Sequence, residues 1–375
     1  MAIDAITREQ LLAEPDWQPT GRSKGELWLL AVSALIGLLG LAAVAYLGWL
    51  FFGADLPVGV RIVLALPAVA ILALMAPSVG KVPDELAVSP EAAPELHALV
   101  RDLAVAAGTP TLEVIAVDMS LNAGVGHVGW RQRSVLVIGM PLWLTLSREG
   151  RLSVLAHEMG HLANGDPLRK RRTLLARAFG ARAVAATGGR NPWRRAVAGG
   201  ESLAEDGGGL VGFLVHGLLA VVNVAGATLQ LLVDAVAMPD SRRAEYRADI
   251  VAARVAGQPA FIDSAEALLV ADRVWQDLWH IAPRVDADEL ERSAAVGRQG
   301  VAAEQIALAR QLTRRTTDLW STHPSEDQRI RLVESLPTTQ PTIRVDDARW
   351  DRIDAELAPW RRRAHRALLG TRDPW

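Results

Sequence analysis

The stretch LAHEMGHL at residues 155–162 decides both the local structure and the chemistry that this sequence can support. On a helix, His157 and His161 lie one turn apart on the same face, so both imidazoles can reach one Zn²⁺ ion. Glu158 lies beside that face, where its carboxylate can accept a proton from water. The surrounding apolar residues bury the rest of the helix. The stretch therefore predicts a catalytic zinc site, because a surface helix that carried these residues by chance would not be so apolar.

The composition limits which residues can hold a metal. The 375-residue chain contains no Cys, which excludes disulfides, thiolate metal sites and Cys nucleophiles. Any metal must therefore be held by carboxylates and by some of the eight His residues. The formal net charge of -2 gives no indication of a nucleic-acid partner. Half of the residues are hydrophobic and only 5% are aromatic, so aliphatic blocks dominate, as is typical of helices that face lipid.

Two uncharged apolar blocks predict a transmembrane hairpin near the N-terminus. As a helix, residues 27–54 would extend roughly 40 Å, which exceeds the ~30 Å thickness of a hydrocarbon core. Residues 62–79 contain two prolines and have about the minimum spanning length. A cleaved signal peptide, the alternative, would have a shorter apolar region. Arg22 and Lys24 precede the hairpin and Lys81 follows it, which predicts that both ends, and with them the catalytic domain, are cytoplasmic. We expect an integral protein of a bacterial-type plasma membrane.

A catalytic zinc also needs a third protein ligand and an open position. Glu245 and Asp249 lie four residues apart in a predicted helix, so one can bind the metal while the other accepts the N–H of a ligating His. The competing interpretation of this pair is a solvated charged face paired with nearby Arg residues. The downstream candidates are Glu201, Glu205, His216, Asp234, Glu245, Asp249, His280 and His323.

At this point the motifs resemble those of a known family. HEMGH at 157–161, ANGD at 163–166, SRRAEYRAD at 241–249 and THPS at 322–325 are similar to motifs of the HtpX-like membrane zinc endopeptidases, which are related to the CAAX prenyl proteases. The resemblance covers roughly residues 27–335. It implies that the zinc ligands are His157, His161 and Glu245, that Glu158 is the general base, that Asp249 supports a ligand, and that Asp166 has a supporting role on the active-site helix.

The resemblance also implies a substrate-binding edge strand and a further catalytic residue. The strand corresponds to the segment that contains Asn122, Ala123 and Gly124, although the family usually has an aromatic residue in place of Gly124. An edge strand binds an extended peptide through main-chain hydrogen bonds; a plain glycine loop is the alternative here. His323 would stabilise an oxyanion or cap the zinc in a resting state, unless the Thr-His-Pro sequence only begins a helix.

The predicted fold class is mostly α with a small β-sheet, in which a transmembrane helical hairpin precedes a zincin-type metallopeptidase domain. Short β-branched runs at 112–117 and 134–139 predict strands. The Trp- and Arg-bearing tail either lies on anionic lipid or packs as a terminal helix. The predicted parts are a polar N-terminal segment at 1–26, the hairpin at 27–80, the peptidase domain at 81–335 with an apolar helix at 210–237, and the tail at 336–375.

The chain between His161 and Glu245 must cross the membrane zero or two times, because both residues meet at one metal. Residues 174–187 are short and carry two Arg residues, each of which costs about 2.5–3.5 kcal/mol at mid-bilayer. We therefore predict zero full crossings. Residues 210–237 carry a polar stripe that should face protein, either the active-site cavity or a packed interior. The stripe comprises His216, Asn223, Gln230 and Asp234.

The predicted function is that of a membrane-anchored, zinc-dependent endopeptidase with one Zn²⁺ per chain, acting in membrane-protein quality control. Its partners would be peptide or protein substrates and the lipid bilayer, with no nucleic acid. The alternative is a membrane-tethered chaperone or scaffold with structural zinc and latent or lost peptidase activity. The intact Glu158 argues against the alternative, since structural zinc needs no base beside its ligands.

Overall fold

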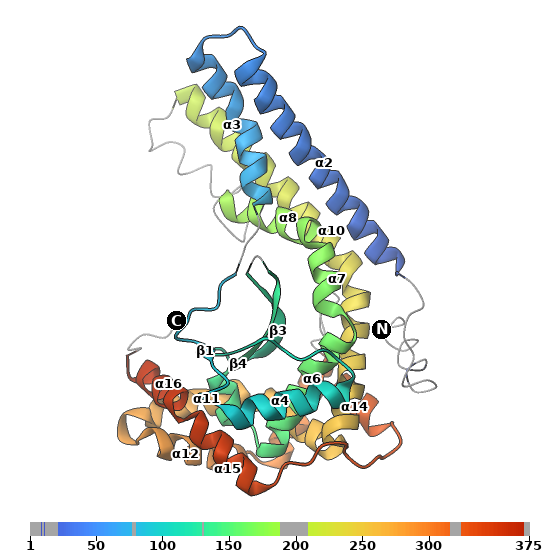
Figure 1. Ribbon diagram of the computed structural model, residues 1–375, viewed down its shortest axis with the longest axis vertical. Helices are drawn as coiled ribbons and strands as arrows, with labels where there is room; N and C mark the ends of the chain where they lie inside the picture. The colour runs from blue at the N-terminus through green and yellow to red at the C-terminus, as the bar shows by residue number, and fades with distance from the viewer. Residues whose placement is uncertain are drawn as a thin grey trace. The chain divides into compact units, whose positions relative to one another are not determined.

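The chain divides into two compact units. The computed structural model describes residues 9, 11, 22–76, 80–129, 131–187, 209–315 and 324–370, without the side chains of 209–216, 218, 314 and 315. The first unit comprises Met1–Gln18, Val79–Pro167 and Ser241–Trp375, and the second comprises Pro19–Ser78 and Leu168–Asp240 (Figure 1). The predicted fold class, mostly α with a small sheet, is confirmed.

The first unit contains a four-stranded sheet with the order β1-β2-β4-β3. Strands β2 and β4 are the two β-branched runs that the sequence predicts, and they pair in parallel. Strands β1 and β3 are antiparallel to β2 and β4, which leaves β3 at one edge of the sheet. The bounds are β1 Ala87–Val88, β2 Val114–Asp118, β3 Ala123–Val128 and β4 Arg133–Gly139.

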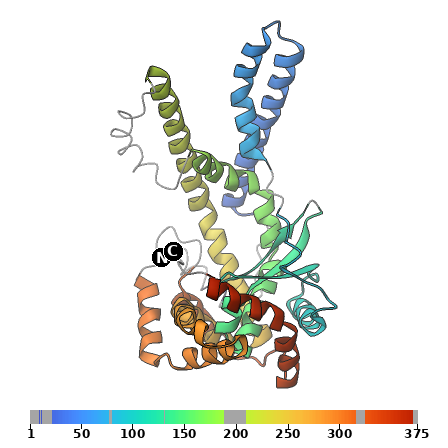
Figure 2. The same ribbon diagram turned by 90° about the vertical axis from the view of Figure 1, so that its left-hand side faces the viewer.

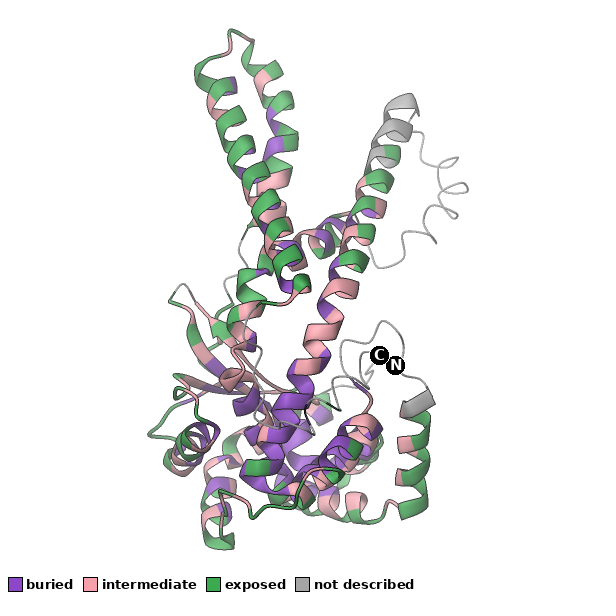
Figure 3. Ribbon diagram, turned by 90° about the vertical axis from the view of Figure 1, so that its right-hand side faces the viewer, coloured by how far each residue is buried: buried purple, intermediate pink, exposed green. Residues whose placement is uncertain are grey.

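Helices pack against this sheet and share one hydrophobic core with it. The core combines buried side chains of β2 and β4 with those of α4, α6, α11 and the C-terminal part of α10. Figure 3 shows the same concentration of buried residues in the lower helices. The helices of this unit are α4 Pro94–Ala107, α5 Met140–Thr145, α6 Arg148–Ala163, the end of α10 (Gly209–Ala256), α11 Gln258–Ile281, the 3-10 turn Ala282–Arg284, α12 Ala287–Gln299, α13 Ala303–Arg315, α14 Glu326–Glu334, α15 Asp347–Glu356 and α16 Ala358–Gly370.

The C-terminal tail packs as helices α15 and α16 within this unit, which decides between the two interpretations of the tail. Trp350 is 3% exposed and lies against Trp143, with ring centroids 6.1 Å apart. The buried Arg151 of α6 contacts Asp354 of α15 at 2.7 Å and Glu291 of α12 at 3.0 Å. Figure 2 shows the red C-terminal helices in the same body as the orange α12. The tail is therefore part of the scaffold that holds α6.

The second unit is a bundle of apolar helices. It contains α2 Lys24–Phe52, α3 Val58–Met75, most of α7 (Asp166–Arg172), α8 Leu174–Ala186 and the first part of α10. Most of the surface of α2 and α3 is exposed although it is apolar (Figure 3). Three helices in the described part of the chain are long and apolar enough to cross a membrane, namely Lys24–Phe52, Val58–Met75 and Leu219–Ala256.

The polar stripe of α10 is hydrogen-bonded within the protein where its side chains are described, and Asn223 contacts α8. The Asn223 amide donates to the hydroxyl of Thr187, at the C-terminal end of α8, and Gln230 donates to Asp234 at 2.9 Å. The backbones of α8 and α10 approach closely, because a side chain at Gly180 would meet the carbonyl oxygen of Gly226 at 2.8 Å. The side chain of His216 lies outside the described residues. The number of membrane crossings stays a prediction.

Candidate metal centre

Helix α6 carries the HEMGH motif, and its local sequence explains its position. Ser147 caps the helix by accepting a hydrogen bond from the N–H of Gly150 at 2.8 Å. The apolar face of α6 is buried in the core. Gly160 lies against α10, where an added Cβ would come within 2.7 Å of the Cα of Ala248. The missing side chain therefore lets α10 cross α6 closely enough to bring Glu245 and Asp249 to the two histidines.

Three side-chain donors converge at this crossing. The Nε2 atoms of His157 and His161 lie 3.1 Å apart. Of the Glu245 carboxylate oxygens, Oε2 lies 3.5 Å from His157 Nε2 and Oε1 lies 3.7 Å from His161 Nε2. Bonds of about 2.0–2.1 Å to a tetrahedral Zn²⁺ separate neighbouring ligand atoms by about 3.3–3.4 Å. The three observed separations lie around that value, so the donor set fits the ion.

Each imidazole is oriented by a carboxylate at its other nitrogen. His161 Nδ1 lies 2.8 Å from Asp166 Oδ2, and His157 Nδ1 lies 3.0 Å from Asp249 Oδ1. These contacts favour the tautomer in which Nδ1 carries the proton and Nε2 carries a lone pair. In that tautomer the two Nε2 lone pairs, 3.1 Å apart, would repel each other unless a proton or a cation lay between them, and both can donate to one cation. The hydrogen-bond pattern therefore also fits a metal centre.

A buried ion pair supports Asp249 next to His157, since Arg329 Nη2 lies 3.4 Å from His157 Nδ1 and both contact Asp249 Oδ1. Arg329 of α14 donates to the Asp249 carboxylate from Nη2 at 2.6 Å and from Nε at 3.0 Å, and from Nη1 to Glu326 at 2.9 Å. Asp249 is 0% exposed. Burial opposes its ionisation, but Arg329 and His157 hold the pKa of this carboxyl below its usual range. Asp249 is therefore a buried carboxylate that stays ionised.

The carboxylates around His157 favour positive charge on its imidazole. Burial opposes the charged form of His157, but Asp249 and Glu245 outweigh it and raise the pKa of this imidazole to about 10. Glu158 is buried on the same helix. One of its carboxylate oxygens lies within 4.8 Å of nitrogen atoms of His157 and His161. The described residues thus form a compact His-Glu-His group that could hold a metal.

Strand β3 presents main-chain groups at the edge of the sheet. Asn122 immediately precedes the strand, and its carbonyl accepts a hydrogen bond from the N–H of Gly139 at 2.8 Å. Pairing groups alternate along an antiparallel strand, so Gly124 points toward β4, opposite Val137. The N–H and C=O groups of Ala123, and those of each second residue beyond it, point to the free edge. Of the three residues predicted to bind substrate, Ala123 is placed best to do so.

Among the described residues, the metal-binding group includes neither His280 nor Asp234. His280 lies at the C-terminal end of α11 beside Trp279, with ring centroids 5.0 Å apart. Asp234 belongs to the second unit. Glu201, Glu205 and His323 lie outside the described residues.

Two contributions to the site were missed in the sequence. The close approach at Gly160 has a local signal, because a glycine between two ligand positions weakens a helix by about 1 kcal/mol and so indicates tight packing. The bond of Arg329 to Asp249 has no comparable signal, because the two residues lie far apart in the chain.

Comparison with known proteins places the chain in a family. Residues 90–336 match Peptidase family M48. The chain is 27% identical over 248 residues to a protease HtpX homolog from Syntrophobacter fumaroxidans, and the alignment covers 65% of the chain and 77% of that protein. It is 30% identical over 179 residues to a protease HtpX homolog from Thermococcus kodakarensis and 32% identical over 178 residues to one from Pyrococcus furiosus. These two alignments cover 46% and 48% of the chain.

The chain spans only 55% and 57% of the two archaeal relatives. No solved structure gives a significant match. The family match nevertheless covers most of the chain and includes the whole described cluster. The resemblance inferred from the motifs is thereby confirmed: the chain belongs to peptidase family M48 and is HtpX-like.

Proposed function

We propose that the protein is a membrane-anchored, zinc-dependent endopeptidase. The observation that carries this proposal is the convergence of His157, His161 and Glu245 at separations of 3.1, 3.5 and 3.7 Å, with Glu158 beside them. These three residues would hold one Zn²⁺. The ion would supply Lewis acidity toward a water molecule and toward the scissile carbonyl.

The residues of the chain have distinct roles in the proposed reaction. Glu158 accepts a proton from the attacking water and returns it to the leaving amine. Asp166 and Asp249 hold the two imidazoles in the orientation that turns Nε2 toward the metal. Arg329 keeps Asp249 ionised through its bidentate contact. We also propose that His323 either stabilises the oxyanion of the tetrahedral intermediate or caps the metal at rest.

The free edge of β3 supports binding of extended peptides. A substrate strand can pair with the outward N–H and C=O groups at Ala123 and beyond, which gives affinity with little dependence on side-chain identity. Such tolerance suits unfolded or membrane-embedded segments, and we propose a role in membrane-protein quality control with the catalytic unit in the cytoplasm. A chaperone with structural zinc would not require the buried Glu158 beside the donors.

Cleavage of an unfolded protein tests this proposal. The full-length chain, purified in detergent with zinc, should cleave casein, and Glu158→Gln should lose nearly all turnover. Glu149→Gln is the matched control, because Glu149 is an exposed carboxylate in the first turn of the same helix. The control should keep the parent rate. Equal rates in Glu158→Gln and the parent would show that Glu158 is not the base, and no cleavage by the parent would favour the chaperone alternative.

A further inference from the structure

The end of α7 in the second unit carries an unneutralised basic cluster, defined here as Lys170, Arg171 and Arg172. All three side chains are exposed. None of them forms an ion pair with the described part of the chain. The cluster is flanked by the exposed leucines Leu168 and Leu174, which are 42% and 40% exposed. Three adjacent cations between exposed apolar side chains are typical of a surface that meets anionic headgroups next to an apolar phase.

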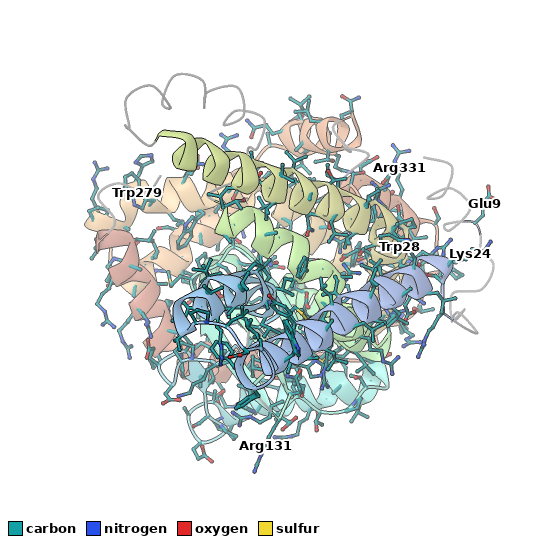
Figure 4. All side chains as sticks on the ribbon, turned by 90° about the horizontal axis from the view of Figure 1, so that it is seen from above. Glu9, Lys24, Trp28, Arg131, Trp279 and Arg331 are labelled. Carbon is teal, nitrogen blue, oxygen red and sulfur yellow. The ribbon has the colours of Figure 1, made fainter. Side chains whose placement is uncertain are left out.

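Helix α2 indicates where that apolar phase begins. Its lipid-facing surface is bounded by Trp28 near one end and by Trp49 near the other, both exposed. At roughly 1.5 Å per residue the two Trp residues lie about 32 Å apart, which matches the ~30 Å hydrocarbon core with Trp at both interfaces. Figure 4 shows Lys24 and Trp28 at the same end of α2. This end therefore lies at a headgroup layer.

Contacts inside the second unit place the basic cluster near the same layer. Leu29, next to Trp28, belongs to a buried group that includes Ala176 of α8. The N–H of Ala176 also donates to Ser33 Oγ of α2 at 3.1 Å. The basic cluster immediately precedes α8 and lies within six residues of Ala176, a rise of at most about 9 Å in a helix. Lys and Arg side chains at this depth extend into the headgroup region rather than into hydrocarbon.

We propose that Lys170, Arg171 and Arg172 form a binding site for the phosphates of anionic phospholipids. We assign a phospholipid as the ligand because its phosphate complements the three cations and because the cluster lies near the Trp28 end of α2. The exposed leucines can contact acyl chains, which a free anion lacks. Each cation near a membrane surface contributes about fivefold to binding of acidic lipid, so three contribute on the order of 100-fold. The site lies a few residues beyond Asp166 in the same helix, and the proposal does not depend on peptidase chemistry.

Lipid binding by the full-length protein tests this site without reference to proteolysis. Binding of fluorescent phosphatidylglycerol and phosphatidylcholine is measured on detergent-solubilised protein at fixed salt. The parent should prefer phosphatidylglycerol, and Lys170→Gln/Arg171→Gln/Arg172→Gln should lose most of that preference. The charge-preserving variant Lys170→Arg/Arg171→Lys/Arg172→Lys should retain it. Unchanged thermal unfolding of both variants shows that the fold is intact.

A charge-matched control distinguishes a specific lipid-binding site from non-specific attraction by the net charge of the protein. Arg284, Arg362 and Arg366 are exposed and form no ion pair with described residues, so their triple Gln variant changes the net charge equally. This control should keep the parental preference. An unchanged preference in the basic-cluster variant would overturn the proposal, as would an equal loss in the control. Displacement of phosphatidylglycerol by millimolar inorganic phosphate would also overturn it, because the ligand would then be a free anion.

Discussion

Asp249→Asn isolates the buried ion pair behind the metal centre. The substitution keeps the shape of the side chain but removes the charge that Arg329 contacts at 2.6 and 3.0 Å. Arg329 then retains Glu326 at 2.9 Å and the more distant Glu245 at 4.0 Å as carboxylate partners. Breaking a buried pair from one side costs about 3–5 kcal/mol. For a domain of this size each kcal/mol lowers the melting temperature by about 2–4 °C, so we expect a fall on the order of 10 °C.

The same substitution weakens the orientation of His157. A carboxylate that orients a metal-bound imidazole typically contributes 10–100-fold to metal affinity, so we expect zinc affinity to fall by about that factor. The double variant Asp249→Asn/Arg329→Gln removes both charges together. It should be less destabilised than the sum of the single variants, with a coupling of about 1–3 kcal/mol, while its zinc affinity stays low.

Thermal unfolding and competition with a zinc chelator are measured on the parent, Asp249→Asn, Arg329→Gln and the double variant. Arg331→Gln is the control on the same helix, because the half-exposed Arg331 pairs with Asp327 at 2.9 Å and Asp327 keeps a second cation, Arg310, at 3.5 Å. It should shift the free energy of unfolding by less than about 1 kcal/mol. Additive losses in the double variant would refute the ion-pair argument. Parental zinc affinity in Asp249→Asn would refute the role assigned to the contact with His157.

Three further predictions concern the scaffold and the proposed oxyanion residue. Gly160→Ala should destabilise the first unit by about 1–3 kcal/mol and lower zinc occupancy, because its Cβ would meet the backbone of Ala248; an unchanged melting temperature would contradict the close crossing. Trp350→Ala should cost about 3–5 kcal/mol in thermal unfolding, since this buried ring packs in the core; a loss below 1 kcal/mol would mean that the tail contributes little. His323→Ala should lower kcat while zinc content stays at the parental level, and a parental kcat would remove the residue from the mechanism.

The elements with strong local patterns could be predicted from the sequence. The active-site helix, the two parallel strands and the first two apolar helices each carry their periodicity within one segment. Helix α10 could not be predicted as one element. The sequence predicts separate helices at 210–237 and 241–256, because Pro239 and the polar residues after it are typical of a helix end. In the structure, α10 continues through these residues without a break. A proline removes one main-chain donor, and tertiary packing can outweigh that loss.

The site was predictable only as far as its contacts are local. His157 and His161 share a face by helix geometry alone, whereas Glu245 depended on the family resemblance because it lies far along the chain. The pairing of each imidazole with its own carboxylate requires the crossing of α6 and α10 at Gly160. The tail had two interpretations because a Trp- and Arg-rich amphipathic helix suits both a lipid surface and a core. The third ligand, the carboxylate partners of the imidazoles and the position of the tail all depend on contacts between residues far apart in the chain. Local sequence patterns do not predict such contacts.

Zinc content per chain is the most direct test of the central claim, which assigns His157, His161 and Glu245 as the ligands and Glu158 as the base. Metal analysis by mass spectrometry is applied to the purified parent, Glu158→Gln, Glu245→Gln and the control Glu201→Gln. We predict about one zinc per chain in the parent, in Glu158→Gln and in the control, and clearly less in Glu245→Gln. A full complement of zinc in Glu245→Gln would contradict the assignment of the third ligand, and loss of zinc in Glu158→Gln would contradict its role as a base rather than a ligand.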